Sequence, residues 1–166
     1  HGEKSAELTK KILKRLKFDN YTIETATRLV KWHDYRFGEK EASMRKAANK
    51  IGTDMMGLLF MVQRFDILAQ NPDMHEEKLK KLEEAKELYE SICAKQHCLT
   101  LKELAVNGRD LIEAGFEKGK QLGEILEYLL GEVLEEPELN KKEKLLELAD
   151  AKFAKAEGKS GKVENA

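Results

Sequence analysis

Histidine and aspartate residues in three parts of the sequence are the side chains best suited to metal chemistry. His1, the adjacent pair His33 and Asp34, and Asp66 occur in the order His, His-Asp, Asp. Imidazole and carboxylate groups together bind divalent metal ions, and such an ion lowers the pKa of a bound water so that it supplies hydroxide for attack on a phosphoester. Phosphoester hydrolysis at a bound metal is therefore the first hypothesis that these residues suggest.

The neighbours of these residues argue against an open metal site. The ligand order resembles that of metal-dependent HD phosphohydrolases, but Tyr35, Arg36 and Phe37 follow the pair, where those enzymes usually carry small residues or glycine and a lysine. The first ligand would be the terminal residue His1, which no preceding helix orients, although metal ligands depend on supporting residues. The sequence thus predicts no metal site, and a histidine at a helix end with an exposed aspartate is the simpler interpretation.

Lysines and arginines form the second set of residues that could do chemistry. They number 30 against 31 Asp and Glu, so the formal net charge is −1 and no global field attracts a polyanion. Any contact with nucleic acid must come from local clusters. Residues 10–17 and 36–50 are rich in basic side chains, whereas residues 76–90 and 124–138 are rich in acidic ones. A solvated helix face is the other interpretation of the first basic cluster.

The elements that must position these side chains are predicted to be helices. Strand-like alternation is nearly absent, and Pro72 and Pro137 fall where helical periodicity stops. Ser5 is expected to cap the first helix and Thr53 or Asp54 the fourth, which is apolar around much of its circumference and should be the central buried helix. The predicted helices cover about residues 5–17, 21–34, 41–51, 55–68, 74–95, 109–114, 119–134 and 140–156, with a short one opening at residue 100.

The predicted fold class is therefore all-α. We expect a helical bundle over residues 1–96, a smaller helical tail module over residues 97–157, and a disordered tail of small polar residues over residues 158–166. One continuous superhelical body is also compatible with these turns.

The cysteines and the lengths of the apolar runs indicate the cellular compartment of the protein. Cys93 and Cys98 lack the spacing of metal ligands and are expected to be reduced thiols. No run approaches the roughly 18 apolar residues of a membrane span, and no signal peptide is evident. The sequence thus predicts a soluble cytoplasmic protein without membrane contact. A start at His1 rather than Met suggests a piece of a longer chain.

Three parts of the sequence occur in an order that carries a family resemblance. They are HGEKSAELT at residues 1–9 with ILKRLKFDN at 12–20, RFDILAQNP at 64–72, and LKELAVNGRDLI at 101–112 with GKQLGEIL at 119–126 and LLGEV at 129–133. They resemble, in turn, the segment after the HD dyad, the arginine-aspartate helix and the C-terminal signature of bacterial HD-type tRNA nucleotidyltransferases, the CCA-adding enzymes. The likeness covers about residues 1–149.

This resemblance implies a division of labour between domains. In that family a nucleotidyltransferase head carries metal-binding aspartates on a β-sheet, and nothing in the 166 residues resembles that head. The resemblance implies that residues 1–96 are a partial HD-like region, that body and tail hold the elbow and acceptor arm of tRNA, and that a missing N-terminal head acts in cis. It implies magnesium in that head, and no catalytic residue, metal ligand or cofactor in this fragment. A fragment of an HD phosphohydrolase and a helical protein-interaction module are the alternatives.

RNA contacts are expected from basic helix faces and helix N-termini, because A-form RNA is recognised by its shape, 2′-hydroxyls and phosphates. A helix start at Gly119 would place lysines beside free N–H groups, although glycines there and at residue 123 could instead permit close helix packing. Arg109 could contact phosphate or pair with Asp110 or Glu113, and Trp32 could stack on a base or belong to the core. The predicted RNA-binding residues are Lys10, Lys14, Arg15, Arg45, Lys46, Arg109, Lys118 and Lys120.

Overall fold

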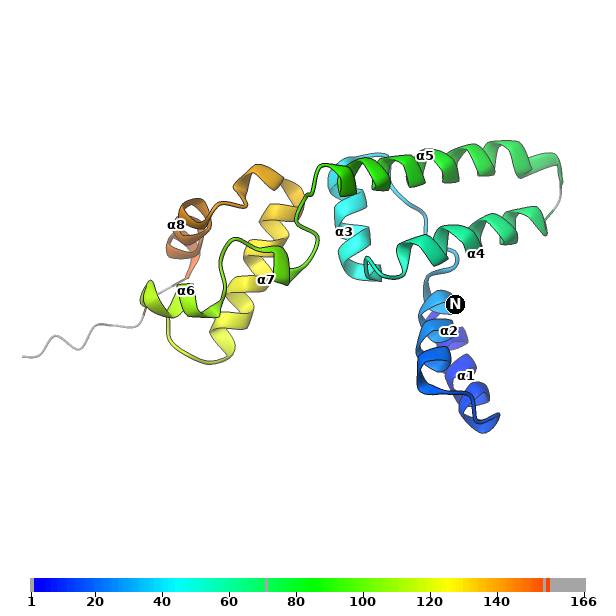
Figure 1. Cartoon of the computed structure of the whole chain (residues 1–166), viewed down its shortest axis with the longest axis horizontal. Helices are drawn as coiled ribbons and strands as arrows, with labels where there is room; N and C mark the ends of the chain where they lie inside the picture. The colour runs from blue at the N-terminus through cyan, green and yellow to red at the C-terminus, as the bar shows by residue number, and fades with distance from the viewer. Residues whose placement is uncertain (1, 71, 154, 156–166) are drawn as a thin grey trace, which may run out of the picture. The chain divides into compact units, whose positions relative to one another are not determined.

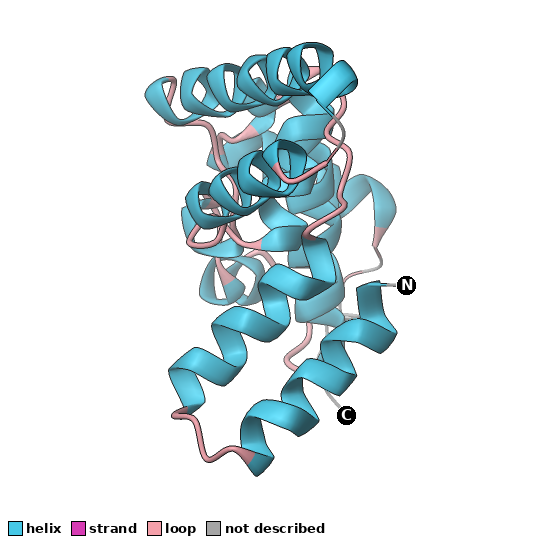
Figure 2. Ribbon diagram, turned by 90° about the vertical axis from the view of Figure 1, so that its right-hand side faces the viewer, coloured by secondary structure: helices cyan, strands magenta, loops and turns pink. Residues whose placement is uncertain are grey.

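All of the described secondary structure is helical. The computed structural model describes residues 2–70, 72–153 and 155 (Figure 1). Within these ranges the chain forms eight α-helices and three short 3-10 helices, and none of these residues belongs to a strand (Figure 2). The predicted all-α class is confirmed. The predicted disordered tail, residues 158–166, lies outside the described residues.

The chain divides after Leu99 into two compact units. The first contains α1 (Gly2–Arg15), α2 (Asn20–Trp32), α3 (Glu41–Ile51), α4 (Met56–Leu68), the 3-10 helix η1 (Pro72–Met74) and α5 (His75–Ala94). The second contains η2 (Leu101–Glu103), α6 (Gly108–Glu113), α7 (Lys120–Glu135), η3 (Pro137–Leu139) and α8 (Lys142–Lys152). No helix in the described ranges is long and apolar enough to cross a membrane.

The first two helices form a hairpin and lie side by side (Figure 2). Because α1 already begins at Gly2, the predicted cap at Ser5 is wrong; the Ser5 carbonyl lies inside the helix and accepts a hydrogen bond from the Thr9 hydroxyl at 2.8 Å. Asp19 caps α2 by accepting from the Thr22 hydroxyl and backbone N–H at 2.6 and 2.9 Å. These hydrogen bonds to Thr22 lower the pKa of Asp19. The predicted helices over residues 5–17 and 21–34 left Asp19 between them without a role as a cap.

Helices α3, α4 and α5 enclose the core of the first unit, whose fully buried side chains include Met44, Met56 and Ile92. The expectation that the fourth helix is the central buried helix holds for one face only, which includes the buried Leu59 and Phe60. Met61 and Phe65 on α4 are 54% and 63% exposed, so only one face of this helix meets the core. The predicted side-chain cap on α4 is wrong. The N-cap residue is Met55, and the Asp54 carboxylate instead accepts a hydrogen bond from Arg28.

Arg28 uses that carboxylate to join α2 to the turn between α3 and α4. Its Nη1 and Nη2 donate to the two Asp54 oxygens at 2.7 and 2.9 Å, and Nη2 also donates to the Ile51 carbonyl at 3.0 Å. The hydrogen bond from Arg28 lowers the pKa of Asp54 and raises the pKa of Arg28 itself. A carboxyl group with a lowered pKa adds stability that is full above its ordinary pKa and is lost as the pH falls through the lowered value.

Replacing Arg28 with alanine is therefore expected to lower the free energy of unfolding by about 0.5–1 kcal/mol at neutral pH, because Asp54 and the Ile51 carbonyl both lose a donor but solvent screens the Asp54 side chain, which is 66% exposed. Urea unfolding of wild type and variant measures the difference. The same comparison at a pH below the lowered pKa of Asp54 should give a smaller difference, since Asp54 is then protonated in both proteins. An equal difference at both pH values would show that the ion pair contributes nothing.

The second unit packs α6, α7 and α8 around fully buried Leu111, Ile125 and Leu145. Asn107 caps α6: its side-chain oxygen accepts from the backbone N–H groups of Arg109 and Asp110, and the Asp110 carboxylate accepts from the Asn107 N–H at 2.9 Å. This reciprocal capping box explains why a six-residue helix begins here. The sequence predicted this helix over residues 109–114 but not its cap.

Candidate nucleic-acid interface

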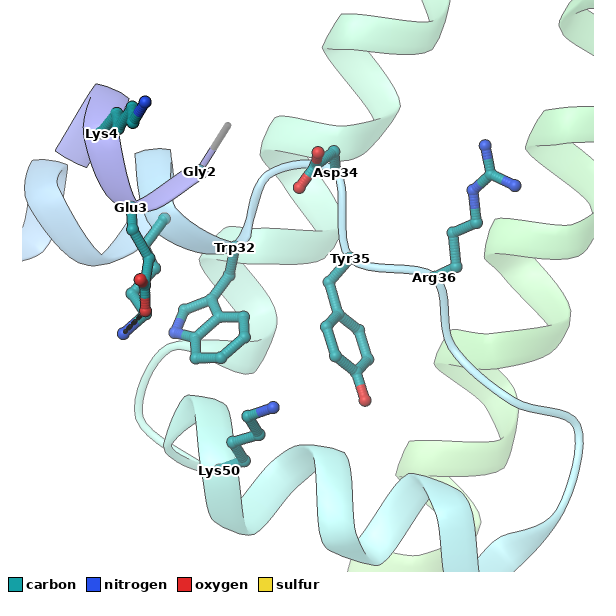
Figure 3. A pocket seen from close by; sticks show the side chains of 9 residues that line it. Gly2, Glu3, Lys4, Trp32, Asp34, Tyr35, Arg36 and Lys50 are labelled. Atoms are coloured by element: carbon teal, nitrogen blue, oxygen red, sulfur yellow. Dashed lines mark ion pairs between the residues drawn. The ribbon is translucent and has the colours of Figure 1, made fainter.

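A groove of about 1020 Å³ lies in the first unit, where the start of α1, the ends of α2 and α3 and the loop after α2 meet (Figure 3). Its lining combines charged side chains with two aromatic rings. The lining residues are Gly2, Glu3, Lys4, Lys31, Trp32, Asp34, Tyr35, Arg36 and Lys50.

The groove carries a local excess of positive charge, with four cationic and two anionic side chains. Lys4, Arg36 and Lys50 are exposed, and the structure records no ion pair for any of them with another described residue. The Lys31 ammonium lies 3.4 Å from the Glu3 carboxylate, but the side chains of this pair are 40% and 83% exposed. Such an exposed pair contributes little and is readily exchanged for a phosphate. The groove is therefore an anion-attracting site on a chain whose net charge is −1.

Trp32, the last residue of α2, forms the aromatic wall of this groove. The ammonium groups of Lys31 and Lys50 each lie 5.2 Å from the centroid of its ring. Tyr35 meets the same ring edge-on, with centroids 5.8 Å apart and planes at 78°. Figure 3 shows Trp32 and Tyr35 next to each other with the Lys50 side chain reaching toward them. A ring flanked by cations has the composition of a site that stacks a base and holds its phosphate.

The loop that carries Tyr35 is fixed to the core beneath it. Gln63, a buried residue of α4, donates from Nε2 to the Tyr35 carbonyl at 2.8 Å. The Tyr35 ring contacts Phe37 at a centroid distance of 5.2 Å, and Phe37 contacts the buried Phe60 at 5.0 Å. The groove wall is thus held by a chain of aromatic contacts that ends in the core of the unit.

None of the five basic residues predicted for the first unit lines this groove. Lys10, Lys14 and Arg15 are exposed on α1, and Lys46 is exposed on α3. Arg45 is only 4% exposed, and its Nη1 lies 3.2 Å from the Glu41 carboxylate and 3.4 Å from Nδ1 of His97. Arg45 therefore has little surface to offer a phosphate.

In the second unit the predicted basic residues lie on helix starts. Lys118 and Lys120 are exposed on either side of Gly119, whose φ of 139° is a conformation that favours glycine. The Lys120 side chain is 93% exposed and lies 3.5 Å from Glu124. Apart from chain neighbours and the backbone of α7, no atom of the described residues lies within 4 Å of the place where a Cβ would stand at Gly119 or Gly123, so close packing against another described helix does not explain these glycines.

Arg109 is exposed at the start of α6. Its predicted alternative partner Asp110 instead forms an ion pair with Lys142 at 2.5 Å. The hydrogen bond from Lys142 lowers the pKa of Asp110. Arg109 thus keeps its guanidinium at the surface of the second unit.

Two of the residues considered for metal binding, His33 and Asp66, have other partners, and Asp34 is exposed. Nδ1 of His33 lies 2.7 Å from the Val30 carbonyl, and Asp66 accepts a hydrogen bond from Gln70 at 2.8 Å. Across residues 2–70, 72–153 and 155 no three His, Cys, Asp or Glu side chains are placed so that they could hold a metal ion. His1 lies outside the described residues.

Comparison with known proteins identifies the family. The family model described as "tRNA nucleotidyltransferase domain 2 putative" matches residues 3–149. No curated protein and no solved structure gave a match. The match covers both units and nearly the whole described chain, in line with the resemblance drawn from the sequence. The chain therefore belongs to the family of tRNA nucleotidyltransferase domain 2.

Proposed function

We propose that this helical domain binds tRNA and holds it for a nucleotidyl-transferring domain of the same enzyme, which adds CCA or part of it to the tRNA 3′ end. The observation that carries the proposal is the groove of the first unit, which exposed Lys4, Arg36 and Lys50 line and in which Lys31 and Lys50 contact the Trp32 ring. Each cation that meets a phosphate releases counterions and so favours binding. Contacts of this kind need no base readout, which suits recognition of A-form RNA by shape and backbone.

The second unit supplies further phosphate contacts in this proposal. Lys118 and Lys120 flank the start of α7, whose first turn carries no acidic residue. The free N–H groups of a helix start and two lysines favour an anion in the same place. Arg109 and the basic face of α1 extend the surface that RNA backbone can contact.

We assign the nucleotidyl-transfer chemistry, and the magnesium it uses, to a domain outside the described residues. Metal-assisted phosphoryl transfer needs carboxylates that converge on an ion. Among the described residues no three His, Cys, Asp or Glu side chains are placed to hold a metal ion.

Replacing both Lys118 and Lys120 with alanine is expected to weaken tRNA binding by at least about fivefold at moderate salt and to reduce the log–log salt slope by about one unit, because phosphate contacts are lost. The pairing of Lys120 with Glu124 keeps the expected effect below that of two unpaired lysines. Anisotropy of fluorescent tRNA measures both quantities.

The matched control replaces Lys80 and Lys81 with alanine. Both lie on α5, where they pair with Glu84 and Glu77. The control removes the same charge and should change tRNA affinity little. A larger effect from the α5 pair than from the α7 pair would place the RNA surface elsewhere.

A further inference from the structure

We propose that the groove beside Trp32 binds one unpaired nucleotide of the RNA, with the base stacked on the indole ring and its phosphate held by Lys50 and Lys31. This inference rests on the proposed function and names the part of the RNA that the groove takes. Three features carry it: an aromatic ring outside the core, two cations beside that ring, and a wall fixed before any ligand arrives.

The aromatic ring is placed for contact with a base. Phe60, which ends the aromatic chain, is 5% exposed, whereas Trp32 is only partly buried and lines an open groove. Base stacking on an aromatic side chain tolerates any base, because every base has a π-face. Paired bases within a duplex already stack on their neighbours and cannot offer this face. The ring therefore selects an unpaired nucleotide over a duplex.

The two cations beside the ring are available to a phosphate. Lys50 lies on α3 and Lys31 on α2, and both ammonium groups lie over the Trp32 ring, 5.2 Å from its centroid. A base that stacks on this ring displaces an ammonium from the ring face, and the displaced ammonium then pairs with the phosphate of the same nucleotide. An aromatic ring attracts an ammonium through its quadrupole but carries no net charge, so it leaves that charge unneutralised. Glu3, the one carboxylate paired here, is mostly exposed and competes weakly with a phosphate.

The wall of the groove is fixed in advance. The Tyr35 backbone is held by buried Gln63, and its ring contacts both Trp32 and Phe37. A ligand that enters a preformed site loses less free energy in ordering the protein. The groove volume of about 1020 Å³ lies at the upper end of that of small-molecule pockets, which suits a nucleotide with its neighbouring backbone.

The intrinsic fluorescence of the full chain tests this directly, because Trp32 is its only tryptophan. Three ligands are compared at one salt concentration: a short single-stranded oligoribonucleotide, a blunt-ended RNA hairpin without unpaired ends and with a tightly stacked loop, and ATP. We expect saturable quenching of Trp32 by the single strand and little by the hairpin. Quenching by ATP as strong as that by the single strand at equal concentration would overturn the RNA assignment in favour of a free nucleotide.

Variants then separate the roles of base and phosphate. Lys50→Ala keeps the fluorophore and is expected to weaken oligonucleotide binding about fivefold at 0.1 M salt, with a salt slope lower by about 0.7. Trp32→Leu, followed by the anisotropy of a labelled oligonucleotide, should weaken binding at least about fivefold. Lys80→Ala on α5 is the control and should leave both readings unchanged. Circular dichroism establishes whether each variant is folded. If Trp32→Leu does not fold, Lys50→Ala still tests the nucleotide site. An unchanged affinity in Lys50→Ala would overturn the phosphate assignment.

Binding of labelled tRNA to the same samples separates this inference from the proposed function. Retention of tRNA together with quenching by the single strand supports both. Retention of tRNA without any change in Trp32 fluorescence would overturn the nucleotide site and leave the proposed function standing. Quenching by the single strand without retention of tRNA would overturn the proposed function and keep a single-strand site.

Discussion

Phe60→Ala is expected to lower the free energy of unfolding of the first unit by about 3–5 kcal/mol, which is the usual cost of removing a buried phenyl ring and leaving a cavity. Phe60 is buried on α4 and contacts Phe37 and Tyr89 at centroid distances of 5.0 and 6.1 Å. Its loss would also release the Phe37 end of the chain of rings that holds Tyr35 at the groove. Denaturant unfolding followed by Trp32 fluorescence reports on this unit, because Trp32 lies within it.

The control for this substitution is Phe65→Ala on the same helix. Phe65 is 63% exposed, so little apolar surface returns to water and the expected change is within about 0.5 kcal/mol. The two variants lose the same atoms and differ only in burial. Equal destabilisation by both would contradict the assignment of the α4 core face.

Lys31→Ala together with Lys50→Ala is expected to weaken tRNA binding about five- to eightfold at 0.1 M salt, because the two lysines hold one phosphate. Each phosphate contact adds about 0.7 to 0.9 to the log–log salt slope, which corresponds to about five- to eightfold at that salt concentration. Both ammonium groups flank Trp32, and loss of Lys31 also leaves the Glu3 carboxylate to repel the backbone. Anisotropy of labelled tRNA over a range of salt concentrations gives the affinity and the slope.

The Lys80→Ala and Lys81→Ala double variant again serves as the matched control, since it removes the same charge from the exposed side of α5. It should shift the affinity by less than about twofold. If the groove variant and the α5 variant behave alike, tRNA responds only to net charge, and the groove has no special role.

Helices were predictable from the sequence because their signals are local. Apolar spacing placed α3 within its observed bounds, and the stop at Gly52 matches a C-cap with a φ of 105°. The N-terminal caps of the helices were harder to predict. Ser5 is a residue type that often caps helices, but it lies inside a helix that starts earlier. Asp54 is also a common cap residue, but its carboxylate accepts hydrogen bonds from Arg28 of another helix. Such competition between partners is tertiary and leaves no local signature.

The predicted burial of α4 was only partly right, for a related reason. Its residues are apolar around much of the helix, but the first unit has helices to cover only the face that holds Met56, Leu59 and Phe60. How many neighbours a helix finds is decided by the packing of the unit. Hydrophobicity alone therefore overstated its burial.

The groove could not be predicted from sequence spacing. Its four cationic residues lie at positions 4, 31, 36 and 50, in three different helices and a loop. Helical periodicity does not indicate that these positions lie close together. The basic run over residues 36–50 was visible, but it singled out Arg45, which is buried against Glu41, and passed over Lys50. Trp32 was noted as a residue that could stack on a base. Only the fold reveals that it does not belong to the core.

The measurement that tests the central claim most directly is the affinity of the full 166-residue chain for tRNA between about 50 and 200 mM salt. The account predicts weak binding that depends little on base sequence and falls with salt along a log–log slope of a few units, because a handful of lysines and arginines meet phosphates. No retention of tRNA even at the lowest salt would contradict it and favour the helical protein-interaction module. An affinity that does not change with salt would equally contradict phosphate contacts as the basis of binding.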